Sequence, residues 1–369
     1  MTRMLHCADL HLSVQEKVYS LSVLSEIASL ATEKKANLLL FAGDTFDSFA
    51  DAEALRGDFK KRIDPLGDTV TVLVLPGNHE DLQRGARKLG SFEFGKARLL
   101  DEEPFGILDL PDMDLVSIPH RKSYADYREW ALPAKHRRFR IVTAHCVVSG
   151  LGIPFDEGEE MVSVIDPDLF QRAGADFAAL GHIHSARTIR LRGTAPDAPV
   201  RTSTLVLSYP GSARVCRKGE TGPRSASMIE VGEDIHATPL VLKSAGQYRE
   251  VLLDVGLNGA IPDIEHLSRE WDPSDRIDIS ISGIVEDENT FKDAADRLAH
   301  ALKPRVRVAN VIRDGVSVLE GISSEPIARK FLELCEKVRP AADAPDFPVW
   351  RKTREIGLLK LKKVLVERA

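Results

Sequence analysis

The sequence contains few cysteines and no long hydrophobic run. Its cysteines stand alone, without the paired spacing of structural zinc sites or of a disulfide framework: Cys7, Cys146, Cys216 and Cys335. The best apolar run, residues 38–42, is far shorter than the roughly 20 residues of a membrane-spanning helix. Polar residues at positions 6, 9 and 11 interrupt the apolar core that a secretion signal requires. We therefore expect a protein of the reducing cytoplasm that does not span a membrane.

The composition is that of an ordinary globular protein, which excludes a disordered chain. Of the 369 residues, 43% are hydrophobic and 29% are charged, and this length predicts two domains with a small appendage. The net charge of −6 gives no global sign of nucleic-acid binding, but basic residues are concentrated in three runs, 119–140, 186–218 and 347–369. Each run is either a solvated face or part of a phosphate-binding track, and the sequence leaves both interpretations open.

Short apolar runs that end in polar clusters recur through about the first 240 residues. The clearest five are residues 4–7, 38–42, 70–75, 141–144 and 177–180. Runs of this length predict strands that are buried on both faces, and the apolar spacing within 16–35 predicts a helix between the first two. Weaker strand patterns at 107–110, 115–118, 204–207 and 226–231 indicate a second sheet. We expect an α/β sandwich that collects polar side chains at one edge.

A different pattern begins near Gly246. Strands are predicted at 249–254, 276–284 and 305–313, with a helix at 287–302, which together form a small α+β unit. Two helical stretches, 325–338 and 348–368, follow a glycine and are joined by a connector rich in Pro, Ala and Asp. The expected organisation is a catalytic domain (1–245), a capping domain (246–321) and a terminal helix pair (322–369). The helix pair either packs internally or binds a partner.

Eight side chains of metal-ligand type lie just after the predicted strands: Asp9, His11, Asp44, Asn78, His79, His145, His182 and His184. A lone histidine is usually structural, but imidazoles beside carboxylates at five strand ends suit Mn, Fe, Zn and similar ions. The D-x-H and H-x-H spacings direct alternate side chains to one side of an extended segment. Gly43, Gly77 and Gly181 each precede a candidate ligand and allow the tight turn that directs it. The sequence therefore predicts a metal site.

In chain order, these motifs resemble the five motifs of the calcineurin-like metallophosphoesterases. They read Asp9-Leu10-His11, Gly43-Asp44-Thr45-Phe46-Asp47, Gly77-Asn78-His79-Glu80, His145 and Gly181-His182-Ile183-His184. The segments 5–12, 209–212 and 220–223 resemble the SbcD and YhaO type of DNA repair exonuclease within that superfamily. The resemblance covers about residues 1–240 and implies a four-layer β-sandwich with flanking helices. Beyond residue 240 it depends only on the order of the domains, a DNA-contacting cap followed by a helix pair.

The resemblance also implies two divalent cations, expected to be Mn²⁺, with Mg²⁺, Fe²⁺ and Zn²⁺ as alternatives. It assigns the first cation to four residues, Asp9, His11, Asp44 and His184. It assigns the second to Asp44, Asn78, His145 and His182, so that Asp44 bridges the pair. A shared anionic ligand is needed because two cations about 3.5–4 Å apart repel each other.

Two further residues are implied in catalysis. His79 is expected to contact the phosphate and to protonate the leaving 3′ oxygen, a task that suits imidazole near neutral pH. Asp47 either orients His79 or a metal ligand, or is only a helix-cap or turn residue. For His120 a packing role is favoured over phosphate contact. Cys7 and Cys146 are expected to be small packing residues.

The leading hypothesis is a metal-dependent DNA nuclease, an exonuclease on duplex ends and an endonuclease on single strands. The resemblance implies DNA repair or processing, an SbcC-like or YhaN-like SMC-type ATPase that binds residues 322–369, and a homodimer formed through the catalytic domain. The alternative is another metallophosphoesterase, either a phosphomonoesterase or a small nucleotide phosphodiesterase. Glu80 agrees with the protein phosphatases, but Ser48 replaces their arginine after the second motif. An inactive scaffold is disfavoured because every motif residue is present.

Overall fold

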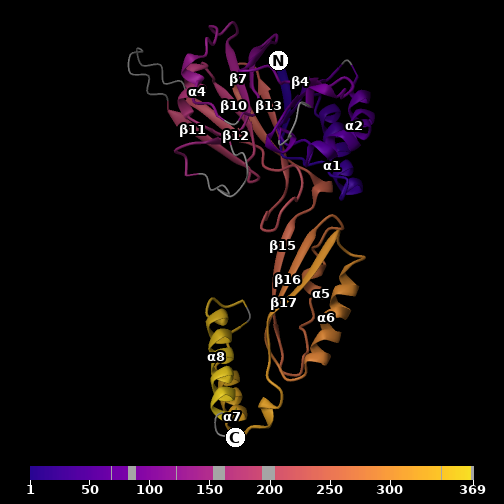
Figure 1. Ribbon diagram of the computed structural model, residues 1–369, viewed down its shortest axis with the longest axis vertical. Coiled ribbons are helices and arrows are strands. Elements are labelled where there is room, and N and C mark those ends of the chain that lie inside the picture. The colour runs from indigo at the N-terminus through magenta and orange to yellow at the C-terminus, as the bar shows by residue number, and fades with distance from the viewer. Residues whose placement is uncertain are drawn as a thin grey trace. The chain divides into compact units, whose positions relative to one another are not determined.

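The computed structural model describes residues 1–67, 69–81, 89–121, 123–152, 163–192, 204–341 and 343–366. The chain separates into two compact units, Met1–Gln247 and Tyr248–Ala369 (Figure 1). Within the described residues, no helix combines the length and the apolar character that crossing a membrane requires.

Two six-stranded sheets form the first unit. The first sheet has the order β14 (Ile235–Val241), β13 (Ser225–Val231), β1 (Thr2–Cys7), β2 (Leu38–Ala42), β3 (Thr71–Leu75) and β4 (Arg98–Leu99). The second has the order β11 (Arg187–Arg192), β12 (Thr204–Tyr209), β10 (Phe177–Gly181), β7 (Phe139–His145), β6 (Met113–Ile118) and β5 (Gly106–Asp109). β1, β2 and β3 are parallel neighbours, as are β6, β7 and β10. Their carboxyl ends therefore lie at one edge of each sheet.

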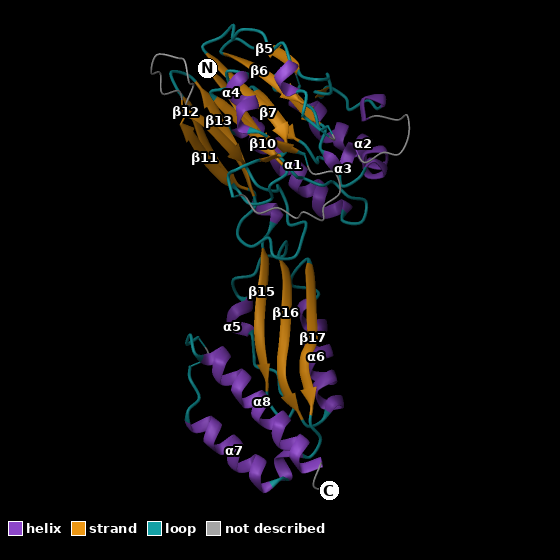
Figure 2. Ribbon diagram, turned by 60° about the vertical axis from the view of Figure 1, so that its left-hand side comes forward, coloured by secondary structure: helices purple, strands orange, loops and turns teal. Residues whose placement is uncertain are grey.

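Successive side chains of β2 point to opposite faces of the sheet, and both faces are covered, so every residue of the run is apolar. Leu38 and Leu40 belong to the core between the two sheets. Leu39 and Phe41 pack instead with α1 (Lys17–Glu33) and α2 (Phe49–Ile63). The second sheet is covered on its other face by α4 (Pro167–Arg172) (Figure 2). The order helix, sheet, sheet, helix confirms the predicted α/β class and its layers.

Most strands of this unit were predictable, but one covering helix was not assigned. α2 buries Phe49, Ala52, Leu55, Phe59 and Ile63 on one face against the first sheet. Ser48 caps it by accepting a hydrogen bond from the Asp51 amide at 3.1 Å. The unit also contains the short elements α3 (Asn78–Asp81), β8 (Val147–Val148) and β9 (Val164–Ile165).

The second unit is a parallel three-stranded sheet with helices. β15 (Tyr248–Val255), β16 (Arg276–Val285) and β17 (Val308–Val318) are connected through α5 (Glu265–Ser268) and α6 (Glu288–Leu302). β17 continues beyond the predicted 305–313. α7 (Pro326–Lys337) and α8 (Phe347–Val366) share a small core with the sheet, in which Leu358 is fully buried. Arg354 of α8 pairs with Asp254 of β15 at 3.1 Å. The helix pair therefore packs internally on one side.

The first unit also contains a fully buried ion pair between two strands of the second sheet. Arg140 and Asp114 are 2% and 1% exposed, and their charged groups lie 3.0 Å apart. The Arg140 guanidinium also donates to the carbonyls of Pro133, Ala134 and Ala173 at 2.8–3.0 Å. Removing one member of such a pair leaves a buried charge and several carbonyls without partners.

We expect Arg140→Met to lower the free energy of unfolding by about 3–5 kcal/mol, because Asp114 loses its partner in a buried position. Urea unfolding at pH 7 measures this change. Arg137→Met is the matched control, because Arg137 pairs with Asp109 on the exposed surface. Equal midpoints for the two variants would contradict the assignment.

Candidate metal centre

The candidate ligands lie in loops at the carboxyl ends of β1, β2, β3, β7 and β10, where the backbone is unusually strained. Four of these residues have positive φ angles, Asp9 (52°), His11 (45°), Asp44 (48°) and His182 (92°). Such backbone costs on the order of 1–3 kcal/mol per residue and persists only when its surroundings hold it. Here the Asp9 amide donates to the Gly43 carbonyl at 3.1 Å, and the His11 amide donates to the Asp44 carbonyl at 2.9 Å. This left-handed backbone directs the ligand side chains toward one another.

Two of the three motif glycines serve a purpose different from the predicted turn. Gly43 does have a positive φ of 92°. Gly181 is needed for close approach, because a Cβ there would lie 1.9 Å from the Ala42 carbonyl oxygen. A Cβ at Gly77 would lie 2.1 Å from Oδ1 of Asp44. Gly181 thus lets loops of the two sheets come close, and Gly77 does the same for neighbouring loops of the first sheet.

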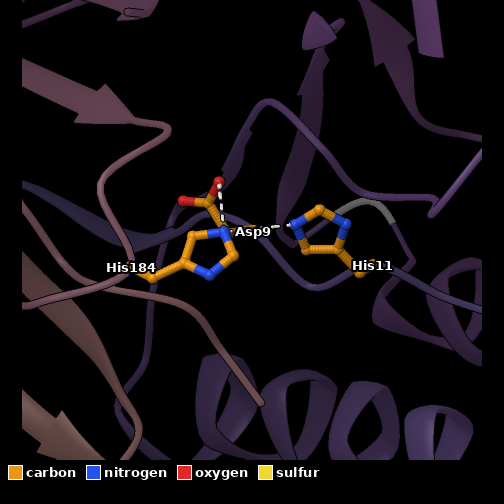
Figure 3. A group of neighbouring side chains, drawn as sticks. All are labelled: Asp9, His11 and His184. Carbon is orange, nitrogen blue, oxygen red and sulfur yellow. Dashed lines mark hydrogen bonds and ion pairs between the residues drawn. The ribbon is translucent and has the colours of Figure 1, made fainter. Parts of the chain in front are cut away.

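Asp9, His11 and His184 form one group of facing acceptor atoms (Figure 3). Nδ1 of His11 lies 3.1 Å from the Asp47 carboxylate, and Nδ1 of His184 contacts the Glu220 carboxylate. Because carboxylates only accept, both Nδ1 atoms carry protons. The two Nε2 atoms, which lie 3.3 Å apart, then face each other with their lone pairs. This arrangement requires a cation, either a proton or a metal ion.

A second group surrounds His145. Nδ1 of His145 donates to the Ala42 carbonyl at 2.9 Å, so its Nε2 is the free ligand atom. That Nε2 lies 3.2 Å from the Asp44 carboxylate and 3.0 Å from Oδ1 of Asn78. The His182 ring lies beside it, 5.2 Å between centroids. Nε2 of His145 therefore lies where it can bind either a proton or a metal ion beside the Asp44 carboxylate.

The pKa values describe how this site behaves with no metal bound. Burial disfavours the His145 imidazolium, yet the carboxylates of Asp44 and Asp9 outweigh burial and raise its pKa to about 10. Burial also opposes ionisation of Asp44, but the neighbouring histidines hold its pKa well below the usual range. Burial and the charge on His145 lower the pKa of His182 to about 3. The metal-free site thus pairs the His145 imidazolium with the Asp44 carboxylate, and buried imidazole and carboxylate donors of this kind fit divalent transition metals.

His79 and Asp47 meet at this site in an unexpected way. The Asp47 carboxylate contacts His11, and only the backbone carbonyl of Asp47 accepts from Nδ1 of His79, at 2.9 Å. Nε2 of His79 lies 4.0 Å from the Asp44 carboxylate, and its side chain is 22% exposed. The helix cap is Ser48, not Asp47. Asp47 therefore positions a candidate ligand with its side chain and His79 with its backbone.

Three charged residues that support the site were not identified from sequence as doing so. Arg214, 3% exposed, donates to the carbonyls of Leu10 and His11 and pairs with Glu16. Glu80 accepts from the amides of Phe46 and Gly77 at 2.9 and 2.7 Å, while burial and the charge of Asp44 raise its pKa to about 8. Glu220 contacts His184. Glu80 and Glu220 lie in segments recognised above, but no local pattern indicates these contacts, because each partner is distant in sequence or is a backbone group.

The remaining candidates lie at the margin of the site. His120 is 6% exposed and lines a small cavity with Glu80 and Asp101. Cys7 and Cys146 are fully buried, in agreement with packing roles.

The basic run at 119–140 is not a continuous phosphate track. Four of its cations are paired with carboxylates: Arg121 with Asp126, Lys135 with Asp176, Arg137 with Asp109, and Arg140 with Asp114. In the run at 186–218, Arg214 is buried, whereas Arg190 on β11 is exposed. Lys122 and Arg201 lie outside the described residues. The charge runs therefore give only limited support for nucleic-acid contact.

Solved structures similar to this chain include several phosphatases. A purple acid phosphatase from yellow lupin (Lupinus luteus) seeds aligns with 67% of this chain at 15% identity and a TM-score of 0.45, and this chain covers 52% of the lupin chain, about half its length. A dimetal phosphatase from Danio rerio aligns with 66% of this chain and 99% of its own, at 10% identity and a TM-score of 0.42. A protein of Thermus thermophilus, TT1561, has a TM-score of 0.38 at 11% identity, over 64% of this chain and 98% of its own.

These structural similarities are too weak to assign a family, but the match to a family profile does assign one. Residues 2–186, half of the chain, match the profile of the calcineurin-like phosphoesterases. The matched residues include every strand end that contributes to the acceptor cluster around Asp44. Members of this family hydrolyse phosphoesters with the help of bound metal ions. The chain belongs to the calcineurin-like phosphoesterase family.

Proposed function

We propose that this protein is a two-metal DNA nuclease of the SbcD and YhaO type. The observation that carries the proposal is the buried convergence of acceptor atoms around Asp44, with His79 beside it and partly exposed. A site of this kind suits an in-line displacement at phosphorus that ends with protonation of a leaving oxygen.

The proposed cation positions share Asp44. Asp9, His11 and His184 would hold one cation with it, and Asn78, His145 and His182 would hold the other; Mn²⁺ is the proposed metal. When bound, such cations offset the charge of the phosphoryl oxygens and activate water. Asn78 supplies a neutral oxygen, so the second position has less ligand charge than the first.

His79 supplies the proton in this proposal. Its Nδ1 hydrogen is committed to the Asp47 carbonyl, so Nε2 is the atom that binds and releases a proton. The partial exposure of the ring leaves Nε2 accessible to a leaving 3′ oxygen. The backbone contact fixes the ring's orientation.

DNA is the proposed substrate because of the SbcD-type segments at 5–12, 209–212 and 220–223. The second unit supports it, since a compact phosphatase would not need the parallel sheet and helix pair of residues 248–369. Sequence-independent phosphate contacts, for which Arg190 on β11 is an exposed candidate, would supply most of the affinity. The alternative, a phosphomonoesterase or small phosphodiesterase, is distinguished by direct assay.

We expect Mn²⁺ binding to release protons and to strengthen as the pH rises from 6 to 8. In the metal-free protein His145 keeps its proton up to about pH 10, and the incoming metal must displace that proton. Titration calorimetry in two buffers of different ionisation enthalpy counts the protons.

We expect Asp44→Asn to lose tight binding of Mn²⁺ altogether, because this substitution removes the shared anionic ligand. Two equivalents still bound to Asp44→Asn would refute the shared position.

We expect His79→Ala to keep its bound Mn²⁺ and its affinity for DNA but to lose about 10²–10⁴-fold in turnover, since general-acid catalysis contributes that much. The wild type and the variant are compared on linear duplex DNA, single-stranded circles and an aryl phosphomonoester. Cleavage of DNA by the wild type supports the nuclease. Hydrolysis of the monoester alone would establish the alternative. An unchanged rate of the variant on DNA would remove His79 from catalysis.

We also propose that the helix pair binds an SbcC-like or YhaN-like SMC-type ATPase. An apolar groove of about 400 Å³ lies between α7 and α8, lined by Ile327, Phe331, Leu334, Leu361 and Val364. A Cβ at Gly357 would lie 2.2 Å from the Phe331 ring, so the two helices are in close contact there. Ile327 and Leu334 are 56% and 52% exposed, as expected for a surface that binds an apolar helix of a partner. A homodimer formed through the catalytic unit completes the proposed assembly.

We expect the double variant Ile327→Glu and Leu334→Glu to lose binding to the ATPase, because two charges would have to be buried in the groove. Pull-down with the purified ATPase measures binding, and light scattering of the free protein measures the dimer. Val349→Glu is the matched control, since Val349 is 67% exposed on α8 and does not line the groove. Equal retention of the ATPase by both proteins would place the docking surface elsewhere.

A further inference from the structure

The histidines of the two proposed cation positions differ in the group that accepts a hydrogen bond from their Nδ1 atoms. His11 and His184 each direct Nδ1 at a carboxylate, of Asp47 and Glu220 respectively. His145 directs Nδ1 at the neutral carbonyl of Ala42. A carboxylate behind a ligating imidazole fixes its tautomer and makes the ligating nitrogen more basic, whereas a carbonyl does so less strongly. The difference divides the site into an anionic side and a more neutral side.

Glu220 comes from a segment that the family match does not include. It lies between β12 and β13, beyond residue 186, where the match ends. Its side chain is only 9% exposed. The second carboxylate oxygen accepts from the Cys216 amide at 2.7 Å. One oxygen is thus occupied by the segment's own backbone, and the other is free to contact His184.

Arg224 holds this segment against the site. Its guanidinium donates to the His184 carbonyl at 3.3 Å and to the Ser212 hydroxyl at 3.0 Å. It also donates to the Thr221 carbonyl at 2.7 Å. These bonds join the Glu220 turn to the backbone of the histidine that Glu220 contacts. The Glu220–His184 contact is therefore a built feature of the fold and not a chance surface pairing.

We propose that Glu220 is a positioning residue for His184, and that Glu220 and Asp47 together make the Asp9–His11–His184 position the tighter cation site, which is filled first. This inference depends on the proposed function, because it requires two cations. Both carboxylates act on the same position, whereas the His145 imidazole of the other position is backed by the neutral Ala42 carbonyl. The second cation is then the exchangeable one.

The test is a Mn²⁺ titration of the full metal-free chain, followed by the electron paramagnetic resonance signal of free Mn²⁺. The wild type is expected to bind in two steps of different affinity. Glu220→Gln, which keeps the shape and removes the charge, should weaken the tighter step about 10–100-fold and leave the weaker step unchanged. Asp47→Asn should weaken the same step, since it acts through the other histidine. Glu233→Gln, an exposed glutamate in the turn between β13 and β14, is the matched control.

The outcomes separate this inference from the proposal on which it depends. A wild type that binds no Mn²⁺ contradicts the two-metal site itself. Two-step binding that Glu220→Gln leaves unchanged, or a loss confined to the weaker step, overturns the inference alone. Thermal melting in a chelator shows whether Glu220→Gln is folded. If it is not, Asp47→Asn decides the question, because an unchanged tighter step in that variant also overturns the inference.

Discussion

The first unit is organised around the repulsion between ligand atoms that lie close together. Imidazole nitrogens with lone pairs and carboxylate oxygens are held close to one another in a largely buried space. Such a cluster is unfavourable unless a positive charge occupies it. Metal binding and folding are for this reason two aspects of one equilibrium: a cation that neutralises the cluster also stabilises the loops that form it.

The surrounding fold compensates for this repulsion with rigid contacts. The left-handed backbone of Asp9, His11 and Asp44 would relax if it were free to do so. Arg214 binds the carbonyls of the first loop, and Glu80 joins the second loop to the third through two amides. Both are buried side chains that hold the backbone of the loops and not the side chains of the ligands. The ligand geometry is consequently set before any metal arrives, which reduces the reorganisation that catalysis would require.

Sequence patterns predicted the elements that depend on local information. The run at 38–42 became β2 without change, because a strand buried on both faces must be apolar at every position. The site motifs were recognisable for the same reason, since each lies at the end of such a strand. The support from Glu220 and Arg214 was not predictable, because their partners lie 36 and about 204 residues away in the chain. The basic run at 119–140 left two interpretations open for the opposite reason: charges adjacent in sequence are paired separately in space.

Asp47 has a consequence for how this protein can change over evolutionary time. It holds His79 through a carbonyl that every amino acid possesses, and it holds His11 through a carboxylate that few possess. Substitutions at this position therefore change the support of the His11 imidazole and leave the backbone contact that orients His79 in place. Position 47 is thus a place where one imidazole of the acceptor cluster can lose its carboxylate support while its neighbour keeps its orientation.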